Sequence, residues 1–132
     1  MRTENVLPGD SSVLASTELQ PLLKGKILVE GDVDYDRCRK IWNGMIDRKP
    51  AIIVQCKTTD DICHAVKFAK SHNMLLSVKA GGHNISGNAV CDGGLMIDLS
   101  PMKTVKVNPD EKLAEVEMGA TWSEFEDRKS VV

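Results

Sequence analysis

Two short apolar runs flank one amphipathic helix in the middle of the chain, and this arrangement limits the possible folds more than any other feature. The first run is Ala-Ile-Ile-Val-Gln at 51–55, and the second is Met-Leu-Leu-Ser-Val at 74–78. Such runs of β-branched and aliphatic residues are typical of strands that are covered on both faces. Because a crossover between strands of one sheet is right-handed and leaves them parallel, the sequence predicts a βαβ unit.

The helix between the two runs has clear boundary signals. Thr58 or Thr59 can cap its N-terminus, and Asp60 and Asp61 suit the positive end of its dipole. Its predicted core stripe is Ile62, Ala65, Val66 and Ala69. We therefore expect one face of this helix to pack on the sheet.

The N-terminal part of the chain is expected to be less ordered. Residues 1–15 are polar and rich in turn residues, which indicates a loose arm. A short helix is predicted over 16–23, capped by one of its first two residues. We divide the chain into this arm with its helix, 1–25, and a main unit, 26–132, which starts with a second predicted helix over 34–43.

The C-terminal third predicts an antiparallel layer. Residues 95–99 form a further predicted strand, and alternating residues over 104–107 and 113–118, with a turn at 108–111, indicate a hairpin. Thr121 and Glu124 have the spacing of a capping box, which predicts a helix start. The predicted fold class is α+β, with a small parallel βαβ layer followed by the start of an antiparallel layer.

Composition excludes several functional classes. The chain has 132 residues, and 17 Lys and Arg against 19 Asp and Glu make a net charge of −2, unlike the basic face of a nucleic-acid-binding domain. No apolar window approaches the roughly 18 residues of a membrane span, and no secretory signal is visible, so we expect a cytoplasmic protein. The cysteines show no C-x-x-C pair, so we expect no metal site and buried, reduced thiols at Cys38, Cys56, Cys63 and Cys91.

The residues after the second apolar run have the composition of an anion-binding loop. Residues 79–88 read Lys-Ala-Gly-Gly-His-Asn-Ile-Ser-Gly-Asn, and a second glycine-rich turn follows at 91–94. Paired glycines let successive backbone N–H groups point into one concavity, which suits phosphate oxygens. The loop also lies at the carboxyl end of a strand, where ligands of open α/β sheets gather. We therefore predict a site for an anion, most naturally a pyrophosphate.

One alternative to an anion site remains open on these residues alone. The loop matches neither the Walker pattern nor the Rossmann fingerprint. Gly81-Gly82 can also make a purely structural turn, with His83 as a hydrogen-bonded, partly buried residue.

The same residues resemble a known family. The string from Lys79 to Asn88, continued by Ala-Val-Cys-Asp-Gly-Gly-Leu-Met-Ile-Asp-Leu-Ser at 89–100, is similar to FAD-linked oxidases of the vanillyl-alcohol oxidase and p-cresol methylhydroxylase type. It looks closest to the berberine-bridge-enzyme-like branch. The resemblance extends over about residues 26–126 and includes Met-Gly-Ala-Thr-Trp at 118–122.

The resemblance implies a cofactor, a reaction and a set of binding residues. Family members wrap the FAD pyrophosphate with this loop, and in many of them its histidine is joined covalently to the flavin, which here is His83. Members take a hydride onto flavin N5 and pass the electrons to oxygen, which implies an oxidase of an alcohol or another hydroxylated small molecule. The implied FAD-binding residues are Lys79, Ala80, Gly81, Gly82, His83, Asn84, Ser86, Gly87 and Asn88.

The resemblance also implies that 26–132 is the N-terminal part of an incomplete FAD-binding domain of the p-cresol methylhydroxylase type. The family's later half and substrate domain, which supply the catalytic base, have no match here, so no catalytic residue is assigned. The chain alone is then expected to bind FAD weakly and not to turn over substrate. The rival prediction is a non-catalytic module that binds a phosphate-containing ligand or a protein partner. A third possibility is that residues 127–132 are not native sequence of this family.

Overall fold

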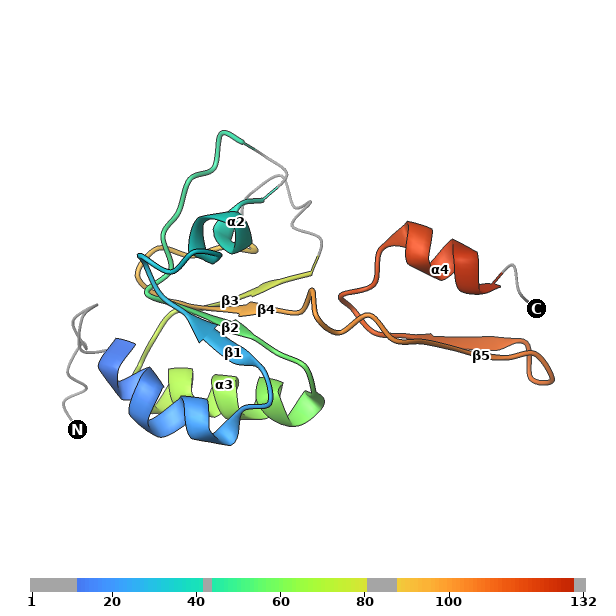
Figure 1. The fold of residues 1–132 in the computed structure, drawn as a ribbon, viewed down its shortest axis with the longest axis horizontal. Coiled ribbons are helices and arrows are strands. Elements are labelled where there is room, and N and C mark those ends of the chain that lie inside the picture. Colours follow the sequence, from blue (N-terminus) through green and yellow to red (C-terminus); the bar gives the residue numbers. More distant parts are fainter. Residues whose placement is uncertain (1–11, 42–43, 81–87, 130–132) are drawn as a thin grey trace.

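A four-stranded mixed sheet forms the centre of the computed structural model, which describes residues 12–41, 44–80 and 88–129. The strand order is β1-β2-β4-β3. The strands are β1 (Lys26–Leu28), β2 (Ile52–Gln55), β3 (Leu76–Lys79) and β4 (Leu95–Asp98). Figure 1 shows this sheet between two helical layers.

The predicted βαβ unit is present, with one strand inserted into it. β2 and β3 both run parallel to β4, which lies between them. β1 adds to β2 in the antiparallel direction and was not predicted. The α+β class with a small parallel layer is confirmed.

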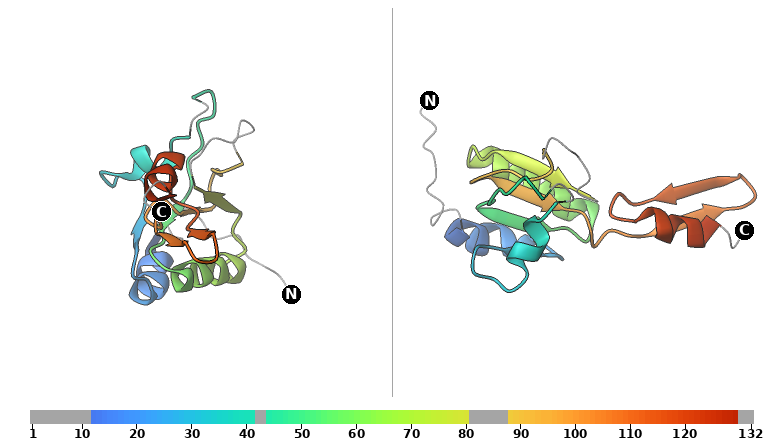
Figure 2. Two further views of the ribbon diagram at one scale, coloured as in Figure 1. Left: turned by 90° about the vertical axis from the view of Figure 1, so that its right-hand side faces the viewer. Right: turned by 90° about the horizontal axis from the view of Figure 1, so that it is seen from above.

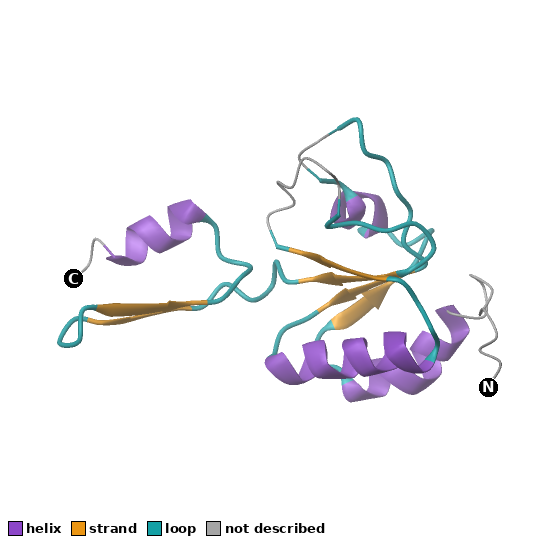
Figure 3. Cartoon of the chain, turned by 180° about the vertical axis from the view of Figure 1, so that it is seen from behind, coloured by secondary structure: helices purple, strands orange, loops and turns teal. Residues whose placement is uncertain are grey.

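Helix α3 (Thr59–Ser71) covers one face of the sheet together with η1 (Ala15–Leu19) and η2 (Gln20–Leu22). Figure 3 shows these helices side by side below the strands. Their shared core contains Ala15, Leu19, Ile52, Val54, Cys56, Ala65, Phe68, Ala69, Leu95 and Ile97. The predicted stripe was wrong at one position, because Val66 is 39% exposed while Phe68 is buried.

The opposite face is covered by α2 (Tyr35–Arg39) and by the chain that returns to β4. The Tyr35 hydroxyl donates to the Pro50 carbonyl at 2.6 Å, and Val90 packs in the same cluster. This helix was predicted over 34–43, but Lys40 is already extended, with φ −67° and ψ 140°, and residues 42–43 lie outside the described part. Five helical residues are marginal in isolation, so packing on the sheet holds α2 in place.

The N-terminal helical segment begins earlier than predicted. Helical structure is described from residue 12, so Ser16 and Thr17 lie inside it and do not cap it. Their hydroxyls instead donate to the carbonyls of Ser12 and Val13, both at 3.0 Å. Most of the arm expected over 1–15 lies outside the described residues.

Three of the four thiols fit the expectation of burial. Cys38, Cys56 and Cys91 are buried, but Cys63 is exposed on α3, so its predicted burial was wrong. All four cysteines are free thiols.

The predicted hairpin follows the sheet as β5 (Val105–Asn108) and β6 (Leu113–Val116). It extends away from the sheet along the long axis of the molecule, together with α4 (Trp122–Lys129) (Figure 2). Gly119 joins the two parts, because its N–H donates to the Met102 carbonyl at 2.9 Å. A Cβ at Gly119 would lie 1.8 Å from the Leu99 carbonyl oxygen, so only glycine fits there.

The capping box of α4 is formed as predicted. The Glu124 N–H donates to the Thr121 hydroxyl at 3.3 Å, and the Thr121 N–H donates to the Glu124 carboxylate at 2.7 Å. The helices in the described part of the chain are too short or too polar to span a bilayer.

One buried carboxylate joins the start of α3 to two loops. Asp61 is 1% exposed, and it accepts backbone N–H groups of Lys24, Gly25 and Lys57, each at 2.9 Å. Burial raises the pKa of Asp61, but these hydrogen bonds outweigh burial and hold its pKa below the usual value of 3.8. Thr58 caps the same helix by accepting the Asp61 N–H at 3.2 Å.

We predict that Asp61→Asn lowers the free energy of unfolding near pH 7 by about 1–3 kcal/mol, because a charged acceptor is lost. Because the pKa of Asp61 is lower in the folded state than in the unfolded state, its charge stabilises the fold at pH values above the unfolded pKa. That stabilisation is lost as the pH falls through the pKa of the folded state. The difference between parent and variant should therefore shrink below pH 3.8. Urea unfolding at several pH values measures it.

The matched control is Asp60→Asn, which removes the same charge from an exposed position in the same turn. It should cost less than about 0.5 kcal/mol. Equal losses for the two variants would contradict the role of the buried carboxylate.

Candidate functional site

Three polar residues end the three parallel strands at the same edge of the sheet. The register places Gln55 beside Asp98, and Asp98 beside Lys79. Their side chains alternate away from the α3 face, so they share the α2 face with Ile53 and Met96. We refer to Gln55, Asp98 and Lys79 as the carboxyl-edge cluster. In Figure 1 this edge points toward the hairpin.

Asp98 is the centre of the cluster and is 1% exposed. One carboxylate oxygen accepts the Gln55 side-chain amide at 3.1 Å, and the other accepts the Ser100 N–H at 3.0 Å. A buried carboxylate without such donors would be costly, so these contacts explain how it is tolerated.

The cluster is joined to α2 through Cys38. The Gln55 amide nitrogen lies 3.1 Å from the Cys38 sulfur, and the Lys79 ammonium donates to the Cys38 carbonyl at 2.7 Å. Burial, and then the charge of Asp98, raises the pKa of the Cys38 thiol. The thiol therefore stays protonated at neutral pH and is not suited to act as a nucleophile.

Most of the predicted FAD-binding residues lie outside the described part of the chain. Gly81, Gly82, His83, Asn84, Ser86 and Gly87 belong to the segment 81–87, which the structure does not describe. Lys79 is half-buried in β3, Ala80 follows it, and Asn88 is exposed where the description resumes. The structure thus establishes where the predicted loop leaves the sheet and where it returns.

The second glycine-rich turn does not belong to this edge. Gly93 and Gly94 precede β4, so they lie at the amino end of the parallel strands. A Cβ on Gly94 would lie 2.3 Å from the Leu75 carbonyl oxygen, and the Gly93 N–H donates to the Lys49 carbonyl at 2.9 Å. Gly94 closely approaches the Leu75 backbone, and Gly93 bonds to the Lys49 backbone, so the described contacts of this turn are with protein.

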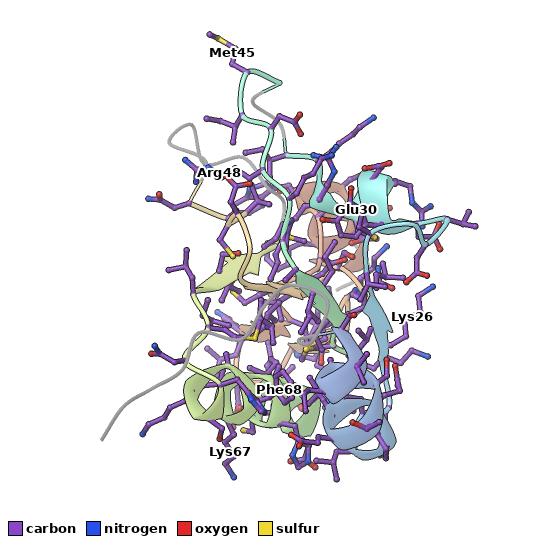
Figure 4. The ribbon with its side chains drawn as sticks, turned by 90° about the vertical axis from the view of Figure 1, so that its left-hand side faces the viewer. Lys26, Glu30, Met45, Arg48, Lys67 and Phe68 are labelled. Atoms are coloured by element: carbon purple, nitrogen blue, oxygen red, sulfur yellow. The ribbon has the colours of Figure 1, made fainter. Side chains whose placement is uncertain are left out.

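The returning part of the loop is held by the connection between α2 and β2. The Arg48 guanidinium donates to the Val90 carbonyl at 3.1 Å, and the Lys49 N–H donates to the Asp92 carboxylate at 2.7 Å. Figure 4 shows Arg48 on the side of the molecule opposite Phe68, which belongs to the α3 face. Both ends of the segment 80–90 are therefore attached to the α2 side, one through Cys38 and one through Arg48.

The sequence-based reasoning did not single out Gln55 and Asp98 as site residues. Each is a polar residue that directly ends an apolar strand, and this pattern marks the carboxyl edge of a parallel sheet. The described residues contain no group of three or more His, Cys, Asp or Glu side chains arranged to hold a metal ion. The Asp98 oxygens already accept from Gln55 and Ser100, and the Lys79 ammonium lies next to a glycine-rich segment, so the edge suits an anion rather than a metal.

Comparison with known proteins identifies the family. The model of the FAD binding domain family matches residues 50–129, which is more than half of the chain. This chain therefore belongs to the FAD binding domain family, and its relatives are FAD-linked oxidoreductases. The predicted family, cofactor and p-cresol methylhydroxylase-type fold are confirmed.

Two relatives illustrate the sequence match. The FAD-linked oxidoreductase YgaK of Bacillus subtilis is 37% identical over 102 residues, which cover 77% of this chain and 23% of the relative. The (R)-6-hydroxynicotine oxidase of Paenarthrobacter nicotinovorans is 30% identical over 86 residues, which cover 65% of this chain and 19% of the relative.

Solved structures agree with the sequence match. The 6-hydroxy-D-nicotine oxidase from Arthrobacter nicotinovorans superposes with a TM-score of 0.83 and 26% identity, over 88% of this chain and 25% of that one. The carbohydrate oxidase from Microdochium nivale superposes with a TM-score of 0.70 and 33% identity, over 79% of this chain and 23% of that one. This chain spans about a fifth to a quarter of the length of these proteins.

We predict that Asp98→Ala lowers the free energy of unfolding by about 2–3 kcal/mol, because the Gln55 amide and the Ser100 N–H lose a charged acceptor. The control Asp110→Ala removes an exposed carboxylate from the hairpin turn and should cost less than about 0.5 kcal/mol. Urea unfolding at neutral pH compares them, and a similar cost for both would contradict the structural role of Asp98.

Proposed function

We propose that this chain is the part of a flavin-dependent oxidase that holds the pyrophosphate of FAD at the carboxyl edge of β3. The observation that carries the proposal is the Lys79 ammonium, which lies where the chain enters its glycine-rich segment. The match to the FAD binding domain family supports the same cofactor.

The residues present fit such a group. A pyrophosphate offers only acceptor oxygens, and it requires cations and N–H donors around it. Lys79 supplies the cation, and the backbone of Gly81, Gly82 and Gly87 supplies donors without a Cβ in the way. Asn84, Ser86 and Asn88 add side-chain donors, and Ala80 adds a small neighbour.

His83 is proposed as the covalent anchor of the cofactor. It is the one imidazole within the segment 79–88, and an imidazole substituent on the flavin makes the ring system a stronger electron acceptor. When bound, FAD supplies hydride acceptance from a substrate carbon and reoxidation by oxygen. The residues of this chain bind and orient the cofactor, and none of them is assigned a proton-transfer role.

The proposed substrate is an alcohol or another hydroxylated small molecule. The names of two relatives support this class, since one is an oxidase of a hydroxynicotine and another is a carbohydrate oxidase. The choice among such substrates, and the catalytic base, are assigned to protein beyond these 132 residues. We therefore expect the chain alone to bind FAD weakly and to leave substrate unchanged.

A non-catalytic module remains the second candidate. β1 and β3 are the outer strands of the described sheet, and exposed strand edges favour pairing with a partner chain. Leu76 and Val78 of β3 are 37% and 50% exposed in this chain. A partner chain that pairs with β3 would cover these apolar side chains. A colourless, monodisperse chain that gains no visible absorbance with FAD would favour this candidate.

We predict that the chain, expressed with FAD present, shows a mass increase of one FAD that survives acid denaturation and is lost in His83→Ala. The control is His64→Ala, which changes a histidine of helix α3 outside the glycine-rich segment and should keep the added mass. Intact-mass and visible spectra measure both. An added mass that persists in His83→Ala would overturn the proposal that His83 is the covalent anchor. A yellow colour that is lost on denaturation would indicate that FAD binds without a covalent bond.

A further inference from the structure

The Gln55 side chain connects three elements at the carboxyl edge. It extends from β2, and its amide nitrogen lies 3.1 Å from the Asp98 carboxylate on β4 and 3.1 Å from the Cys38 sulfur on α2. Asp98 accepts only, so it determines which end of the Gln55 amide faces it. The nitrogen is thereby directed toward both partners.

The position of the Lys79 ammonium depends on the same helix end. The ammonium donates a hydrogen bond to the Cys38 carbonyl at 2.7 Å, and Cys38 is the penultimate residue of α2. The last carbonyls of a helix have no partner within the helix, so this oxygen is available to an external donor. Because α2 has only five residues, its end is located by outside contacts, and Gln55 provides one of them.

These contacts form a closed ring. Asp98 is the register neighbour of Lys79 on one side and of Gln55 on the other, and Cys38 lies across the ring. A lysine side chain loses much conformational freedom when it is held in one position. A cation that is already held before the ligand arrives avoids part of that cost on binding.

We propose that Gln55 is a positioning residue of the FAD site, which fixes the end of α2 so that the Cys38 carbonyl aims the Lys79 ammonium at the anionic part of the cofactor. The inference rests on the proposed function, since it takes Lys79 as the residue that contacts FAD. Gln55 itself does not contact the cofactor.

The test measures FAD affinity in a double-mutant cycle with Gln55→Met and Lys79→Met. Methionine is unbranched and similar in length, so it keeps the volume of each side chain while it removes the polar contacts. Flavin fluorescence gives Kd for the 132-residue chain and each variant, all carrying His83→Ala so that FAD binds reversibly, and urea unfolding gives the stability of each. We expect Kd to rise about tenfold in Lys79→Met and about three- to tenfold in Gln55→Met. The double variant should bind no more weakly than Lys79→Met alone.

Gln20→Met is the matched control. Gln20 is also a partly buried glutamine with two hydrogen bonds, to the Gly25 carbonyl at 3.2 Å and from the Ile27 N–H at 3.0 Å, but it joins η2 to β1. It should lose similar stability and leave Kd unchanged.

The outcomes distinguish the positioning role of Gln55 from the proposed FAD site at Lys79. If Gln55→Met weakens FAD binding equally with and without Lys79, Gln55 does not act through Lys79 and the inference is overturned. If Lys79→Met weakens binding and Gln55→Met does not, the inference fails while the proposed function stands. If the unaltered chain does not bind FAD, or if Lys79→Met leaves Kd unchanged, the proposed function fails, and the inference fails with it.

Discussion

β4 lies between two parallel neighbours, β2 and β3, and this position sets the register of the parallel strands. Leu95, Met96 and Ile97 are fully buried, and the strand pairs with β2 on one edge and β3 on the other. A slip of one residue would turn the Asp98 carboxylate from the α2 face into the apolar core of the α3 face, and this cost holds the register. The same register sets Gln55, Asp98 and Lys79 in one row at the carboxyl edge.

The two faces of the sheet make different kinds of contact. The α3 face is an apolar core, and Asp61 fastens the start of its helix to the neighbouring loops. The α2 face carries polar attachments, because Lys79 and Arg48 hold the two ends of the glycine-rich segment through backbone carbonyls. The larger apolar core therefore lies on the α3 face, and the candidate site lies at the end of the α2 face, which has a smaller apolar cluster.

Many of the helix and strand boundaries were predictable from local sequence signals. The Thr58 cap, the hairpin and the capping box at Thr121 each depend on residues within a few positions of one another, and each was confirmed. β1 was missed, because three residues are too few to show a period. The roles of Gln55 and Asp98 depend on contacts more than 15 residues apart in the chain, and no local pattern contains them. The family was recognisable because its glycine-rich loop is contiguous in sequence, although that loop lies outside the described residues.

FAD bound at the carboxyl edge of the parallel strands should be visible by backbone amide NMR during an FAD titration. The amide signals of Cys56, Ala80 and Leu99, next to the carboxyl-edge cluster, should shift with increasing FAD. The signals of Lys49 and Gly93, at the amino edge, should stay in place and serve as internal controls. Shifts confined to the amino edge, or no shifts at all, would show that FAD does not bind at the carboxyl edge.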